Sequence, residues 1–115
     1  MANRQFQSCI EACNTCASAC DYCSSECLRE DDVKMMAECI RLDMDCAALC
    51  RMAAGYMARD SKFIGELCGL CADVCEACTA ECARHSQPHC QECARACRKC
   101  AAECRRMALE FKPAR

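Results

Sequence analysis

The sequence has few of the large apolar residues that normally build a protein core. It contains no tryptophan, two tyrosines and three phenylalanines in 115 residues, and Val, Ile, Leu and Phe together number 14. A fraction that low is typical of disordered chains and of disulfide scaffolds. Disorder also requires a high net charge, whereas 15 basic and 17 acidic residues leave a formal charge of only −2. We therefore expect a folded chain whose core is filled by another residue type.

Features that would direct the chain to a membrane, to export or to nucleic acid are also lacking. No apolar run approaches the ~20 residues of a membrane span. The N-terminal sequence Met-Ala-Asn-Arg-Gln-Phe lacks the apolar segment of a signal peptide. The near-neutral charge gives no support for nucleic acid or an anionic membrane as a partner. We expect a cytoplasmic, reducing location, in which disulfides are not expected.

What the chain has in abundance is cysteine, with 19 residues in four groups. Three of the groups alternate steps of three and four residues without a break. The groups are Cys9, Cys13, Cys16, Cys20, Cys23 and Cys27; Cys39, Cys46 and Cys50; Cys68, Cys71, Cys75, Cys78 and Cys82; and Cys90, Cys93, Cys97, Cys100 and Cys104. This spacing places the thiols of each group on one stripe of a helix, facing partner helices.

The breaks between the cysteine groups carry the signals of helix ends. Candidate N-caps are Asp31 or Asp32, Asp60 or Ser61, and Ser86, and Pro88 is tolerated in a first turn. The sequence predicts helices over about residues 3–28, 32–58, 61–84 and 88–111, within one domain spanning residues 1–115. Connections this short force antiparallel neighbours. The expected fold is all-α, an antiparallel up-down-up-down four-helix bundle with a cysteine-lined core.

Nineteen inward-facing thiols need a chemical reason. Leucine or valine would fill a core with more buried area and no risk of oxidation. Disulfides within a helix are excluded, because side chains at i and i+4 have Cβ atoms roughly 5–6 Å apart, beyond the ~3.5–4.5 Å that a disulfide requires. The CxxC matches, among them Cys13/Cys16, Cys68/Cys71, Cys75/Cys78 and Cys97/Cys100, follow from the helical spacing and lack the βαβ context of a redox motif. A thiol redox buffer remains an alternative.

Metal binding is the favoured chemistry, because thiolates select the soft ions Cu(I) and Zn(II) and iron–sulfur clusters. No compact four-cysteine grouping suggests an iron–sulfur cluster. Zinc needs about four thiolates per ion, which would leave roughly nine negative charges buried. Cu(I) accepts two or three thiolates that can bridge, so about one ion per thiolate keeps the core near neutral. Eight CxxxC pairs match the ~4.5 Å span of two metal–sulfur bonds in line. Cys39, Cys68 and Cys90 are left to bridge between helices or to coordinate with other groups.

Four cysteine-striped helices with repeated CxxxC, over essentially the whole chain, resemble the bacterial copper storage proteins, a family of four-helix-bundle Cu(I)-binding proteins. The resemblance implies a non-enzymatic store of many Cu(I) ions held by the 19 cysteines. It also implies a homotetramer of the cytosolic branch, with copper chaperones or target cuproproteins as possible partners. A metallothionein-like protein that detoxifies zinc or cadmium remains an alternative.

Antiparallel packing sorts the other stripe residues between the two bundle ends. One end gathers an apolar set, namely Phe6, Met57, Ile64, Met107 and Phe111, which we expect to form a plug. The opposite end, which we call the mouth, gathers Cys27, Met35, Met36, Cys39, Cys82, His85, His89 and Cys90. We predict that copper enters there.

Four residues of the stripes are candidate ligands besides the cysteines. His85, His89 and Met36 lie at the mouth, whereas Met35 is expected to pack. Asp43 occupies a core position that seldom holds a carboxylate without a partner, and it is expected either to ligate copper or to accept a hydrogen bond from a thiol. Three aromatic residues fall off the stripes, where we expect packing or subunit contacts: Tyr22, Tyr56 and Phe63.

Overall fold

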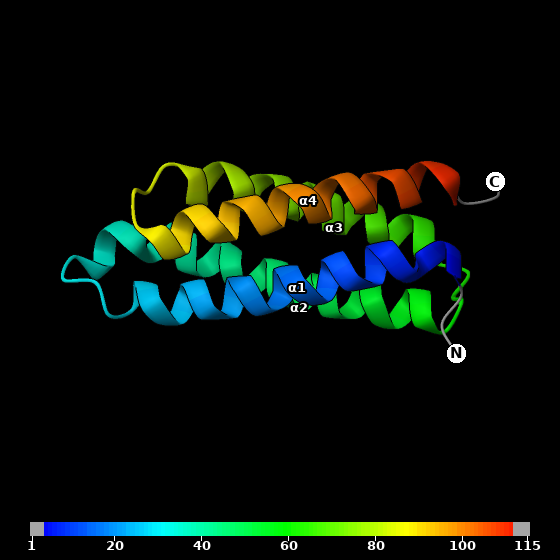
Figure 1. Ribbon diagram of the computed structural model, residues 1–115, viewed down its shortest axis with the longest axis horizontal. Coiled ribbons are helices and arrows are strands. Elements are labelled where there is room, and N and C mark those ends of the chain that lie inside the picture. Colours follow the sequence, from blue (N-terminus) through cyan, green and yellow to red (C-terminus); the bar gives the residue numbers. More distant parts are fainter. Residues whose placement is uncertain (1–3, 112–115) are drawn as a thin grey trace.

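Four antiparallel helices form the bundle in the computed structural model, which describes residues 4–111 (Figure 1). The elements are α1 (Arg4–Cys27), a 3-10 turn η1 (Val33–Met36), α2 (Ala37–Ala58), α3 (Ile64–Ala83) and α4 (Pro88–Glu110). Helix α1 packs against α2 and α4, and α3 packs against the same two helices. The bundle measures 48 × 29 × 17 Å. This confirms the expected fold class.

The segment before α2 differs from the prediction of a helix from residue 32. Asp32 caps a 3-10 turn instead, because its side chain accepts a hydrogen bond from the backbone N–H of Met35 at 3.4 Å. The α-helix then begins at Ala37. The turn matters for the site because it leaves Met36 buried and Met35 67 % exposed.

The starts of α3 and α4 also differ slightly from the prediction. Asp60 has a φ of 55°, a left-handed conformation that ends α2, and Ser61 accepts from the backbone of Phe63 at 3.0 Å. Helix α3 therefore begins three residues later than predicted, at Ile64 rather than residue 61. The N-cap of α4 is Gln87 rather than Ser86, and the expected proline follows in the first turn. The predicted helix start at residue 3 lies outside the described residues.

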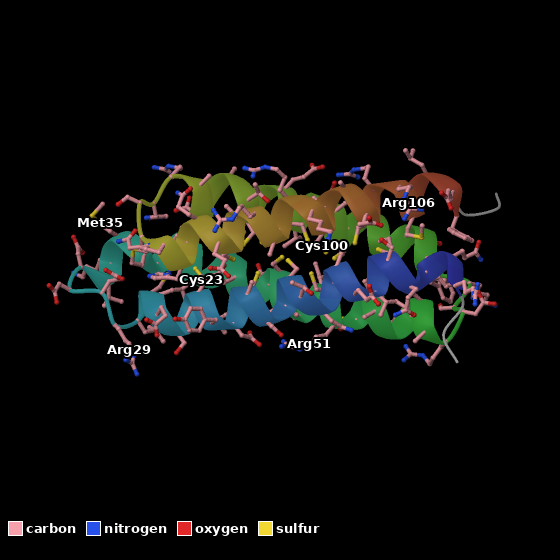
Figure 2. The ribbon with its side chains drawn as sticks, viewed as in Figure 1. Cys23, Arg29, Met35, Arg51, Cys100 and Arg106 are labelled. Atoms are coloured by element: carbon pink, nitrogen blue, oxygen red, sulfur yellow. The ribbon has the colours of Figure 1, made fainter. Side chains whose placement is uncertain are left out.

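Sulfur fills the centre of the bundle. All 19 cysteine side chains are fully buried, and the yellow sulfur atoms lie between the helices in Figure 2. Charged side chains such as Arg29, Arg51 and Arg106 point away from this core. Alanines including Ala17, Ala47, Ala72 and Ala94 are buried beside the thiols. Thiols thus take the place that leucine and valine occupy in an ordinary bundle.

The two ends of the bundle are built differently. Figure 1 shows the start of α1, the end of α4 and the α2–α3 connection at one end of the bundle. The side chains buried at this end are apolar. There the rings of Phe6 and Phe111 lie 5.1 Å apart between centroids, and Met57, Met107 and Ile64 are buried. This confirms the predicted plug. The other end carries the α1–α2 and α3–α4 connections. None of the helices within residues 4–111 has the length and hydropathy needed to cross a membrane.

Candidate metal centre

The thiol groups form a continuous network along the bundle axis. Six of the eight CxxxC pairs have their Sγ atoms within 3.8–3.9 Å: Cys23/Cys27, Cys46/Cys50, Cys71/Cys75, Cys78/Cys82, Cys93/Cys97 and Cys100/Cys104. These distances approach the span of a single bridging metal ion. The helical spacing alone therefore brings most of the predicted pairs into reach.

The remaining two pairs, both on α1, are linked through α4. The Sγ of Cys104 lies 3.8 Å from Cys9 and 3.6 Å from Cys13. In the same way, the Sγ of Cys97 lies 3.6 Å from both Cys16 and Cys20. A thiol of the neighbouring helix thus contacts both members of each of these two pairs. The thiols also interact within each pair, Cys9 with Cys13 and Cys16 with Cys20.

The three cysteines without a CxxxC partner make contacts between helices, as predicted. Cys39 lies 3.4 Å from Cys82 between the two Sγ atoms. Cys90 lies 3.8 Å from Cys23 and 4.0 Å from Cys27. Cys68 interacts with the thiols of Cys9 and Cys104 at the plug end.

Neighbouring thiols form groups of four that share members. In each group the four sulfur atoms lie within 4.8 Å of one another, and five examples are Cys13/Cys71/Cys100/Cys104, Cys16/Cys46/Cys50/Cys75, Cys16/Cys20/Cys46/Cys97, Cys20/Cys78/Cys93/Cys97 and Cys23/Cys27/Cys39/Cys90. Cys16 and Cys46 each belong to two of these groups, as do Cys20 and Cys97. A mononuclear structural zinc site takes four ligands around one ion. Shared thiols instead suit a multinuclear cluster with bridging sulfur.

Burial keeps protons on two of the thiols near the mouth, Cys27 and Cys90. It raises the pKa of the Cys90 thiol to about 12, with the charge of Cys39 acting in the same direction. Burial likewise raises the pKa of Cys27 above its ordinary value. A thiol that ligates a metal must lose its proton. Metal uptake by these thiols therefore releases protons and depends on pH.

Asp43 lies among thiols in the middle of the core and is fully buried. Its Oδ1 accepts hydrogen bonds from Cys78 and Cys93 at 3.3 Å and from Cys82 at 3.5 Å. Its Oδ2 lies 3.9 Å from the Cys39 thiol. Burial, followed by the nearby Cys93 and Cys39, raises the pKa of Asp43 to about 8. Of the two predicted roles for this carboxyl group, the structure bears out that of hydrogen-bond acceptor.

The mouth is hollowed by a cavity of about 290 Å³ that brings together loop residues from both connections. Its lining consists of Glu30, Asp31, Asp32, Met35, Met36, Arg84, His85, Ser86 and Gln87. Met36 is buried beneath this cavity, as a stripe residue should be. The expectation that Met35 packs is wrong, because the 3-10 turn projects its thioether outward at the rim (Figure 2).

The two histidines of the mouth have different surroundings. The Nδ1 atom of His89 lies 3.5 Å from the Sγ atoms of Cys23 and Cys90 and 4.0 Å from that of Cys27. Its Nε2 atom lies 3.1 Å from Glu30 Oε2. The structure thus brings one predicted histidine directly to the thiols.

His85 is also placed at the mouth but faces a carboxylate. Its Nε2 atom lies 2.9 Å from Glu81 Oε2, and within residues 4–111 it has no thiol at hydrogen-bonding distance. The carboxylate partners of both histidines were missed by sequence reasoning. The i, i+4 spacing of Glu81 and His85 could have indicated their pairing. Glu30 is 59 positions away from His89 in the chain and left no local signal.

A four-helix bundle with a shared network of buried thiols and an imidazole at one end defines a protein built to hold a cluster of soft metal ions. The chain belongs to the copper storage protein family, whose sequence model matches residues 2–109.

Solved structures of this family resemble the chain closely. The Cu(I)-bound copper storage protein BsCsp3 is 48% identical with a TM-score of 0.88, over 91% of this chain and 99% of that one. The apo form of copper storage protein 3 from Bacillus subtilis is 48% identical with a TM-score of 0.83, over 90% and 98%. A cytosolic copper storage protein from Streptomyces lividans, solved with five coppers, is 40% identical with a TM-score of 0.88, over 91% and 92%. Both metal-free and copper-bound relatives therefore share this fold.

Proposed function

We propose that the chain is a non-enzymatic, cytosolic store that holds and buffers many Cu(I) ions in its thiol core. The observation that carries the proposal is the sharing of thiols between adjacent four-sulfur groups. Bridging thiolates allow about one Cu(I) per thiolate, so that each monovalent ion replaces one proton and the core stays near neutral. The same exchange with divalent zinc would leave thiolate charge uncompensated.

The 19 cysteines are the proposed ligands, with Asp43, Met36, His85 and His89 as further candidates. In this scheme copper enters at the mouth and moves inward from sulfur to sulfur, because successive thiols lie less than 4 Å apart along most of the network. The aromatic and thioether plug closes the far end. His89 is supported as a mouth ligand by its 3.5 Å distances to two thiols. Asp43 would hold the surrounding thiols in place until copper displaces their protons.

Anaerobic titration of the reduced, metal-free protein with Cu(I), followed by metal analysis, tests this function. We expect saturation at about one ion per thiolate, with the helical circular dichroism signal already present before copper is added. Saturation at only a few ions would contradict the proposal. A matched zinc titration distinguishes the metallothionein-like alternative, which predicts about four thiolates per ion and a fold that depends on metal. Rapid reversible oxidation without metal retention would favour the redox buffer.

We also propose that the chain forms a homo-oligomer, a tetramer by family resemblance, through the outer surface of α2 and α3. Tyr56, Phe63, Leu67 and Leu70 line an apolar groove there with Glu66. Phe63 and Leu70 are about half exposed in the single chain, at 52% and 51%. Arg59 lies over the Tyr56 ring beside the groove. A second copy placed antiparallel would bury these apolar side chains. It would also set Arg59 of one copy near Glu66 of the other.

Analytical ultracentrifugation tests this surface. Leu70→Glu should shift the protein towards smaller species. Leu28→Glu, at a leucine that is 61% exposed elsewhere on the molecule, is the matched control and should leave the assembly unchanged. A monomeric wild type, or equal effects of both variants, would contradict the proposed interface.

Copper chaperones or target cuproproteins are the partners that we propose to exchange copper with this chain. We do not propose nucleic acid or membranes as partners.

A further inference from the structure

Glu30 lies in the α1–η1 connection and contacts the one mouth histidine that faces thiols. Its Oε2 atom is 3.1 Å from His89 Nε2, while Nδ1 of the same ring is 3.5 Å from Cys23 and Cys90. The His89 side chain is 10% exposed and that of Glu30 is 33% exposed. The ring is therefore held between a carboxylate on the solvent side and thiols on the core side.

The chemistry of these atoms fixes the proton on the ring. An ionised carboxylate can only accept hydrogen bonds, so Nε2 must carry the hydrogen that it donates to Glu30. A neutral imidazole has only one N–H, which leaves Nδ1 with a free lone pair. The thiols of Cys23 and Cys90 can then donate to Nδ1. The same lone pair is the one that would bind a metal ion after those thiols lose their protons.

We propose that Glu30 is a positioning residue that holds His89 with Nδ1 directed at the thiols of Cys23, Cys27 and Cys90, and so prepares a nitrogen ligand for copper at the mouth. The role of Glu30 towards copper rests on the proposed storage function. Carboxylates that orient metal-binding histidines commonly act through the ring nitrogen that faces away from the metal. Glu30 reaches His89 from a different connection, so it also ties the two sides of the mouth together.

The chain supplies its own matched control. Glu81 makes the same kind of carboxylate–imidazole hydrogen bond to His85 at 2.9 Å, and its side chain is also partly buried, at 12% exposure. Within residues 4–111, however, His85 has no thiol at hydrogen-bonding distance. Removing Glu81 therefore removes an equivalent carboxylate–imidazole hydrogen bond and one negative charge without disturbing a ring that faces the thiol core.

The first test is independent of copper. Nitrogen-15 NMR of the reduced apo-protein at mildly alkaline pH should show His89 protonated on Nε2, with an N–H signal protected from exchange with water. Glu30→Ala should abolish that protection, while Glu81→Ala should abolish only the corresponding signal of His85. A His89 ring protonated on Nδ1, or one unchanged in Glu30→Ala, would overturn the proposal. Circular dichroism verifies that each variant remains helical.

The second test measures release of Cu(I) to a chelator. Glu30→Ala should release the most labile copper about tenfold faster, the low end of the range for loss of an orienting partner. Glu81→Ala should change the release rate less than Glu30→Ala, because within residues 4–111 His85 has no thiol at hydrogen-bonding distance. His89→Ala should resemble Glu30→Ala, and the double variant should be no faster than His89→Ala alone, because the two residues act as one unit. Additive effects would overturn the positioning role. A failure to bind many Cu(I) ions would refute the storage function, while the NMR result would still decide whether Glu30 orients His89.

Discussion

Replacing the buried carboxyl group of Asp43 should remove a pH dependence from the stability of the metal-free bundle. The fully buried side chain is surrounded by thiols from all four helices: Cys23 on α1, Cys39 on α2, Cys78 and Cys82 on α3, and Cys93 on α4. None of these groups is a cation that would compensate an ionised carboxylate. Asp43→Asn keeps a carbonyl oxygen as hydrogen-bond acceptor and cannot ionise.

The direction of the pH dependence follows from the state, folded or unfolded, in which Asp43 binds its proton more tightly. Burial raises the pKa of Asp43 from 3.8 to about 8, so the folded state holds a proton that the unfolded chain has released. The stability associated with this proton is fully present below about pH 4 and is lost as the pH rises towards about 8. Each pH unit between these limits costs about 1.4 kcal/mol. Raising the pH from about 5 to about 7 should therefore lower the free energy of unfolding by about 3 kcal/mol.

Urea unfolding of the reduced apo-protein without oxygen, followed by circular dichroism, measures this loss. Asp43→Asn should lack the carboxyl-dependent part of the decline and should be the more stable protein at about pH 7. Both proteins carry the same thiols, so the difference between them isolates Asp43. Asp45→Asn, at an exposed aspartate on the same helix, should follow wild type. Parallel pH profiles of wild type and Asp43→Asn would refute the reasoning.

Three further predictions concern the core, the plug and the mouth. Cys97→Ser should lower the Cu(I) capacity measured by metal analysis by about two ions, because its thiol is shared between two four-sulfur groups. Cys68→Ser should lower the capacity by about one ion. Equal losses in the two variants would argue against shared ligation. Phe6→Ala should lower the free energy of unfolding in the same urea assay by about 3–5 kcal/mol, since the Phe6 ring is fully buried against Phe111. Phe63→Ala, at a half-exposed ring, should change the free energy of unfolding by less than about 1 kcal/mol. Replacing Met36, His85 and His89 together should slow copper loading in stopped-flow measurements with little change in capacity, and unaltered rates would count against the mouth.

The fold could be predicted because cysteine reports helical geometry directly in this chain. Steps of three and four placed the thiols on inward stripes, and the short breaks between groups left an antiparallel bundle as the consistent arrangement. The boundaries were less predictable. Both Asp31 and Asp32 are plausible caps, and only the backbone geometry shows that Asp32 starts a 3-10 turn before α2. That turn decides which of the adjacent methionines is buried.

The type of ligand in the site could be predicted from the sequence, but the contacts between the ligands were harder to predict. The stripe predicted that Asp43 would lie in the core, and the sequence placed both histidines at one end. The sequence did not show that His89 faces thiols while His85 faces a carboxylate. This difference depends on contacts between distant segments, such as that of Glu30 with His89. Two of the three α1 pairs are a similar case, because a thiol of α4 contacts both members of each pair and CxxxC spacing gives no sign of that contact. Local spacing identifies a thiol stripe but not which helix completes each contact.

The linkage of α1 pairs through α4 bears on how copper and stability are related. If Cys97 ligates the same ions as Cys16 and Cys20, and Cys104 the same ions as Cys9 and Cys13, each ion connects the first and last helices of the chain. Metal that binds the folded bundle and not the unfolded chain stabilises the fold by mass action. The apolar plug and the buried alanines are contacts that do not require metal. On the proposed function, copper would therefore reinforce a preformed bundle, which could release its ions without having to unfold.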